Sequence, residues 1–170
     1  MSGLNPLFTV ASIIAVASTA MVITRTVAVH ALLYLVVSLL AIAVIFATLG
    51  APFAAALEII IYAGAIMILF IFVVMMLNLD RGDAARESRW LSPQSWAGPA
   101  ILAGLMVAEL IYGGLRDGGI GQAGLVVGPS AIGRELYGPY ILAAELASML
   151  LLAGLVSAYH LGRAIGARQE

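Results

Sequence analysis

The chain has 170 residues, of which 63% are hydrophobic and 10% are charged, and its mean hydropathy is +1.09. A soluble domain carries about 25% charged residues, so this composition excludes a water-soluble domain and indicates an integral membrane protein. The net charge is −1 and lysine is absent, so no basic patch exists to bind nucleic acid. Cysteine is also absent, which excludes disulfides, thiolate catalysis and cysteine-ligated metal clusters.

The first apolar segment covers residues 4–23. A secretory signal places positive charge before its apolar run and a cleavage site after it. Here the nearest positive charge, Arg25, follows the run. We therefore expect a retained membrane span and not a cleaved signal peptide.

The second predicted span covers residues 29–49. Its polar side chains recur at intervals of four residues, which places them on one stripe of a helix; they are His30, Tyr34 and Ser38. The sequence Gly-Ala-Pro at 50–52 then ends the helix, and the proline suits the first turn of the next one. This connection has no charge, which predicts a tight turn.

The third predicted span, residues 53–78, contains one charged residue, Glu58. An α-helix of this length exceeds the roughly 30 Å of bilayer hydrocarbon, so tilt or a local change of winding must absorb the excess. Tyr62 lies four residues after Glu58, on the same face of an α-helix. Gly64 follows within a run of small residues and is a weak helix former. This combination predicts a hinge or bulge.

The rest of the chain supplies two further predicted spans, residues 97–115 and 138–162. A short charged loop from Asp80 to Arg89 precedes the fourth span, flanked by Trp90 and Trp96 as interfacial anchors. The connection before the fifth span, residues 116–137, is rich in glycine and too polar to cross a membrane, and we expect it to be loosely ordered.

Five spans form an all-α polytopic fold, which we expect to be a single transmembrane domain over residues 1–170. An odd number of spans places the termini on opposite sides of the membrane. With the N-terminus outside, the inner segments carry arginines 25, 81, 86, 89, 163 and 168, and the outer segments carry arginines 116 and 134. The positive-inside rule therefore predicts the N-terminus outside and the C-terminus inside.

Three carboxylates fall within the predicted spans: Glu58, Glu109 and Glu145. Ionisable groups at membrane depth are costly and often handle protons or ions. In the predicted topology all three lie in the outer half of the bilayer, where hydration or hydrogen bonds to neighbouring helices are the alternative explanation. No set of residues has the spacing of a metal site or a catalytic constellation.

The third span also carries a family resemblance. Residues 56–78, ALEIIIYAGAIMILFIFVVMMLN, closely resemble the chain 6 (subunit J) family of proton-pumping NADH:quinone oxidoreductase, respiratory complex I. The segments 29–35, 96–99 and 138–152 match the same family. The family usually has Asn-Pro before the Val-His that opens the second helix. This chain has Val-Ala there, so we expect Thr24 or Thr26 to cap that helix.

The resemblance implies a non-redox subunit of the complex I membrane arm in the bacterial cytoplasmic (inner) membrane. It would lie near the quinone-reducing peripheral arm, among subunits of the A, H, K and N types. It implies no cofactor in this chain, with FMN, iron–sulfur clusters and quinone in other subunits.

The resemblance further implies a π-bulge in the third helix, mapped to residues 62–70, that converts to α-helix and couples quinone reduction to proton translocation. The gating or proton-path candidates are then Glu58, Tyr62, Gly64 and Phe70, with Glu109 and Glu145 as secondary candidates.

Two other functions compete with this interpretation. The chain could be a purely structural subunit that seals the arm junction and has no part in proton conduction. It could also be an autonomous transporter or cation/proton antiporter, which the absence of internal repeats and of a midplane Lys/Glu pair disfavours. No residue supports an enzyme that acts alone.

Overall fold

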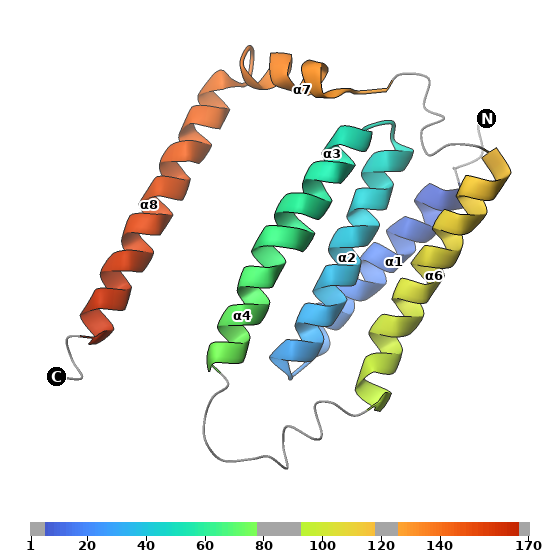
Figure 1. The fold of residues 1–170 in the computed structure, drawn as a ribbon, viewed down its shortest axis with the longest axis horizontal. Coiled ribbons are helices and arrows are strands. Elements are labelled where there is room, and N and C mark those ends of the chain that lie inside the picture. Colours follow the sequence, from blue (N-terminus) through green and yellow to red (C-terminus); the bar gives the residue numbers. More distant parts are fainter. Residues whose placement is uncertain (1–5, 78–92, 118–125, 167–170) are drawn as a thin grey trace. The chain divides into compact units, whose positions relative to one another are not determined.

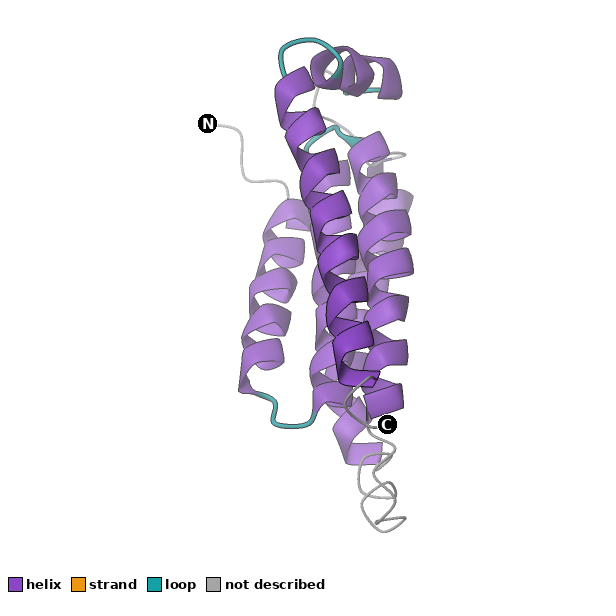
Figure 2. Ribbon diagram, turned by 90° about the vertical axis from the view of Figure 1, so that its left-hand side faces the viewer, coloured by secondary structure: helices purple, strands orange, loops and turns teal. Residues whose placement is uncertain are grey.

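The structure, a computed structural model, describes residues 6–77, 93–117 and 126–166 (Figure 1). Within these ranges the chain forms helices joined by short loops and contains no strand (Figure 2). It divides into two compact units, residues 1–127 and 128–170. The first contains α1 (Pro6–Thr24), α2 (Ala28–Thr48), α3 (Pro52–Leu57), η1 (Glu58–Ile66), α4 (Met67–Leu77) and α6 (Pro93–Asp117), and the second contains α7 (Pro129–Leu136) and α8 (Ile141–Gly166).

The predicted all-helical fold with five membrane spans is confirmed in the described part of the chain. The stretches long and apolar enough to cross a membrane are Pro6–Thr24, Ala28–Thr48, Pro52–Val74, Trp96–Gly113 and Ile141–Gly162. Trp96 belongs to α6, with about half of its surface exposed, and does not lie in a preceding loop. The charged loop at 80–89 and Trp90 lie outside the described residues, and the orientation of the termini stays a prediction.

The turn between α2 and α3 satisfies its backbone amides with hydrogen bonds to carbonyls at the end of α2. Gly50 has φ +83°, a left-handed conformation that glycine adopts without strain. Its amide donates to the Ala47 carbonyl at 3.2 Å, and the amide of Ala51 donates to the Phe46 carbonyl at 3.0 Å. These two bonds form a Schellman motif, and Pro52 starts the next helix. The predicted tight, uncharged turn is therefore present.

The start of α2 differs from the prediction. Its N-cap residue is Val27, and no side chain caps it. The Thr24 hydroxyl instead donates to the Ala20 carbonyl of its own helix at 3.0 Å. The prediction that Thr24 or Thr26 caps α2 was wrong, since the hydroxyl of Thr24 meets the nearer acceptor four residues back, a common alternative for threonine.

Helix α2 is the central helix of the first unit, because it packs against α1, α3, η1, α4 and α6. Its polar stripe faces α1: the hydroxyls of Ser38 and Thr19 are hydrogen-bonded at 2.8 Å, and Ser38 also lies 3.4 Å from the Ala15 carbonyl. In a bilayer, lipid is as apolar as the helix surface, so close packing and hydrogen bonds of this kind hold helices together. The stripe at Tyr34 and Ser38 therefore serves helix association.

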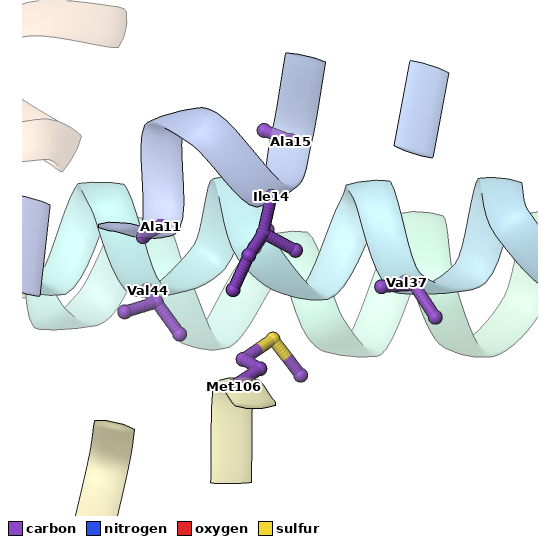
Figure 3. Close-up of a cluster of buried hydrophobic side chains, with 7 residues drawn as sticks. Ala11, Ile14, Ala15, Val37, Val44 and Met106 are labelled. Atoms are coloured by element: carbon purple, nitrogen blue, oxygen red, sulfur yellow. The ribbon is translucent and has the colours of Figure 1, made fainter. Parts of the chain in front are cut away.

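The core of the first unit lies where α1, α2 and α6 meet. Met106 of α6 reaches toward Ile14 of α1 (Figure 3), and Ile14 is 1% exposed. Small side chains on α1, including Ala11 and Ala15, let the helices approach closely. The remaining members of this cluster come from α2 and are Val37, Ala41 and Val44.

One end of this bundle is fixed by an arginine and a tyrosine. The guanidinium of Arg25 lies 5.3 Å from the centre of the Tyr34 ring, a cation–π distance, and also contacts Met21 sulfur at 3.4 Å. Tyr34 is 4% exposed, and its hydroxyl lies against the backbone of Gly98 in α6. A Cβ atom at position 98 would nearly coincide with that hydroxyl, so this helix contact requires glycine.

The second unit pairs the short helix α7 with the long apolar helix α8. The expectation of a loosely ordered connection over 116–137 was wrong for residues 129–136, which form α7 with Pro129 in its first turn. The amide of Tyr140 donates to the Glu135 carbonyl at 3.0 Å, which links the two helices. In the described part of α8, no side chain is buried within this unit.

Candidate functional site

The third span changes its winding twice. The amide of Glu58 bonds carbonyls three and four residues back, as in the preceding α3. Over Glu58–Ile66 the helix is π-helical, and the amide of Met67 still reaches the Tyr62 carbonyl, five residues back. Residues 67–77 then continue as α4. A π segment holds more residues per turn than an α-helix and is frequently found at functional sites.

Gly64 stands where the π winding is crowded. A Cβ atom at this position would lie 3.1 Å from the Ile59 carbonyl oxygen, closer than ordinary van der Waals contact. That oxygen is five residues back, so the crowding arises from the π winding itself. A side chain at this position would therefore require the Ile59 carbonyl to shift by a few tenths of an ångström.

Glu58 and Tyr62 occupy different environments. Glu58 is 9% exposed, whereas Tyr62 is 50% exposed. The prediction that they share one face assumed the α-helical period, in which residues four apart are neighbours. A π-helix has only slightly more residues per turn than an α-helix, so residues four apart still project close together, and the shared face stays a prediction.

Phe70 lies in α4, beyond the π segment, and is 52% exposed. The predicted bulge at 62–70 therefore overlaps the observed segment only from Tyr62 to Ile66. The sequence reasoning missed Met67, which is 1% exposed although Ile68 beside it is 65% exposed. A uniformly apolar run gives no signal that singles out one buried position.

The two other carboxylates lie on helices other than η1. Glu109 is on α6 and is 9% exposed, and neither of its oxygens has a hydrogen-bond partner in the described structure. Hydration, or hydrogen bonds to neighbouring helices near the interface, stays the alternative explanation for it. Glu145 is exposed on α8, in the second unit. Over the described ranges, no three His, Asp or Glu side chains are grouped to hold a metal.

These features define a polytopic helical membrane protein whose third span is partly π-helical. Residues 18–161 match the family described as NADH-ubiquinone/plastoquinone oxidoreductase chain 6. The chain belongs to this family.

Three bacterial relatives carry the name NADH-quinone oxidoreductase subunit J. The chain is 56% identical to that of Escherichia coli strain K12 over 158 residues, covering 92% of this chain and 85% of the relative. It is 57% identical to that of Pseudomonas aeruginosa over 151 residues, covering 88% and 91%. It is 45% identical to that of Buchnera aphidicola subsp. Acyrthosiphon pisum over 157 residues, covering 91% of each chain.

Proposed function

We propose that this chain is a membrane-arm subunit of bacterial NADH:quinone oxidoreductase in the inner membrane. In this proposal it holds no redox cofactor and helps couple quinone reduction to proton translocation. Family membership and the relatives' names support the assignment to the oxidoreductase. The observation that supports a coupling role is the π-helical segment Glu58–Ile66 inside a membrane span.

The proposed mechanism is a change of winding in η1. If the π segment rewinds to α-helix, the hydrogen-bond pattern shifts by one residue, and α4 rotates by about 100°, the angular step of one residue. Met67 is the buried residue at the start of α4, between the exposed Ile66 and Ile68. A rotation of one residue would bring one of these isoleucines into the place of Met67, against α2.

This rotation would change the side chains that α4 offers to neighbouring subunits. In the observed winding, Phe70 and Tyr62 are about half exposed on the unit. The buried carboxylate of Glu58 begins the segment that rewinds. We propose that the exchange of bulky side chains opens and closes a water path in an adjoining subunit of the K type, with Glu58 at its margin. Subunits of the A, H and N types are the other expected partners.

The substitution Gly64→Val tests the coupling role. A valine side chain would crowd the Ile59 carbonyl and favour α winding, so quinone-coupled turnover and proton pumping should fall. NADH oxidation by an artificial acceptor should stay intact because it does not use the membrane arm. The matched control is Gly104→Val in α6, where a Cβ atom meets nothing within 4 Å.

The two competing roles give different results in this experiment. A gate requires a Gly64→Val complex that assembles normally and loses coupling, while Gly104→Val behaves as the wild type. Wild-type coupling in an assembled Gly64→Val complex would leave only the sealing role. A second measurement uses the absence of cysteine from this chain: a thiol introduced by Met67→Cys should gain reagent access during turnover only if α4 rotates.

A further inference from the structure

The bundle of α1, α2 and α6 encloses a carboxyl group that the proposed switch does not use. Glu109 is 9% exposed, and both of its carboxyl oxygens are buried without a hydrogen-bond partner in the described structure. The backbone amide of Ala11 in α1 faces its carboxyl group but makes no full hydrogen bond to either oxygen.

The surroundings of Glu109 are apolar. Met106, one turn earlier on α6, is 6% exposed and belongs to the core cluster with Ala11. Leu110, the next residue, packs against the same cluster. One turn later, a Cβ atom at Gly113 would lie 2.7 Å from a methyl carbon of Leu7, so α1 and α6 are in close contact on that side as well.

No described cation lies near enough to balance a negative charge at Glu109. On α1, α2 and their connecting turn, the titratable groups are Arg25, His30 and Tyr34. Arg25 follows Ala11 by 14 residues, roughly 20 Å along the helix direction. Tyr34 contacts Gly98, which precedes Glu109 by 11 residues on α6, roughly 16 Å. His30 lies a further turn from Glu109 than Tyr34 does. On α6 itself, Tyr112 is 52% exposed and brings no positive charge. Arg116 follows Glu109 by seven residues, roughly 10 Å along the helix, and its side chain lies outside the described part of the structure.

We propose that Glu109 is a proton-binding site of the closed α1–α2–α6 bundle, separate from the π-helical segment. A carboxylate without a full hydrogen bond in a low-dielectric interior is far less stable than the neutral acid of the same shape. The closed bundle therefore holds Glu109 as the neutral acid. When α6 separates from α1, water reaches the carboxyl group and the proton dissociates. Each opening of the bundle thus releases one proton from Glu109, and each closing takes one up.

Amide hydrogen exchange of α6 peptides in the assembled, bilayer-embedded oxidoreductase tests this proposal. Wild type and Glu109→Gln are compared at each of several pH values, so that the intrinsic pH dependence of exchange cancels in their ratio. If opening releases one proton, the opening equilibrium constant of the wild type, divided by that of Glu109→Gln, should rise by up to about tenfold per pH unit. Glu145→Gln, which removes an exposed carboxyl on α8, is the control. The ratio of the wild-type opening constant to that of Glu145→Gln should not change with pH.

A pH-independent ratio for Glu109→Gln would overturn the proposal, because the proton count at Glu109 would then be the same in the closed and open bundle. Failure of both Glu109→Gln and Glu109→Met to assemble would also overturn it, since a neutral side chain of similar size should replace a neutral acid. Neither result bears on η1, whose role is read from pumping in Gly64→Val. The two proposals can therefore fail separately.

Discussion

Replacement of Gly98 by alanine should disturb the contact between α6 and α2, and its effect should depend on Tyr34. The new Cβ atom would nearly coincide with the Tyr34 hydroxyl oxygen and would lie 3.0 Å from the ring carbon that carries it. Overpacking of a filled interior costs about 1–3 kcal/mol. Since each 1.4 kcal/mol is a factor of ten, opening of this contact should become about 5- to 150-fold more frequent.

Removal of the hydroxyl should relieve most of this strain. Tyr34→Phe keeps the ring under the Arg25 guanidinium and loses only a long contact of 3.5 Å between the hydroxyl and that group. Alone it should therefore cost less than about 1 kcal/mol. In the Tyr34→Phe background the alanine still meets the ring carbon, so relief is partial. We expect a favourable coupling of roughly 0.5–3 kcal/mol between the two substitutions.

The assay is a double-mutant cycle on the assembled complex, with opening free energies measured by amide hydrogen exchange of α2 and α6 peptides. The gain in helix propensity from glycine to alanine is the same in both backgrounds and cancels in the cycle. Strictly additive effects would refute the reasoning, because they would mean that the alanine does not meet Tyr34. Improved protection in Gly98→Ala alone would refute it as well.

Three other substitutions should change stability in directions that the packing determines, each measured by exchange protection of the helix concerned. Gly104→Ala should stabilise α6 by up to about 1 kcal/mol, because its Cβ meets nothing within 4 Å and alanine is the better helix former. Gly113→Ala should destabilise the α1–α6 contact, because its Cβ lies 2.7 and 2.8 Å from the Leu7 methyl carbons; unchanged protection would show that Leu7 turns aside at no cost. Thr19→Val should cost about 0.5–1 kcal/mol by removing the 2.8 Å bond to Ser38.

The sequence predicts the helices and spans of this chain well because hydrophobic length and turn chemistry are local properties. Gly50 and Pro52 mark the end of one helix and the start of the next, and both take the predicted positions. The surplus length of the third span and the weak helix former Gly64 indicate a local change of winding, and the π segment contains that glycine.

Properties that depend on contacts between helices could not be predicted in the same way. The burial of Glu109 requires α1 to lie against α6, and the two helices are far apart in the sequence. Tyr34 also makes its closest contact with a glycine of a different helix. The burial of Glu58 and the exposure of Tyr62 likewise depend on which helices pack against the third span.

The Schellman turn at Gly50 has a consequence for how the chain enters the bilayer. Its amides at 50 and 51 are already bonded within α2, and the connection carries no charge, so the loop presents little polar surface to hydrocarbon during insertion. We expect α2 and the third span to leave the translocon together as a preformed hairpin. The loop between them would then need no separate translocation step of the kind that a charged loop requires.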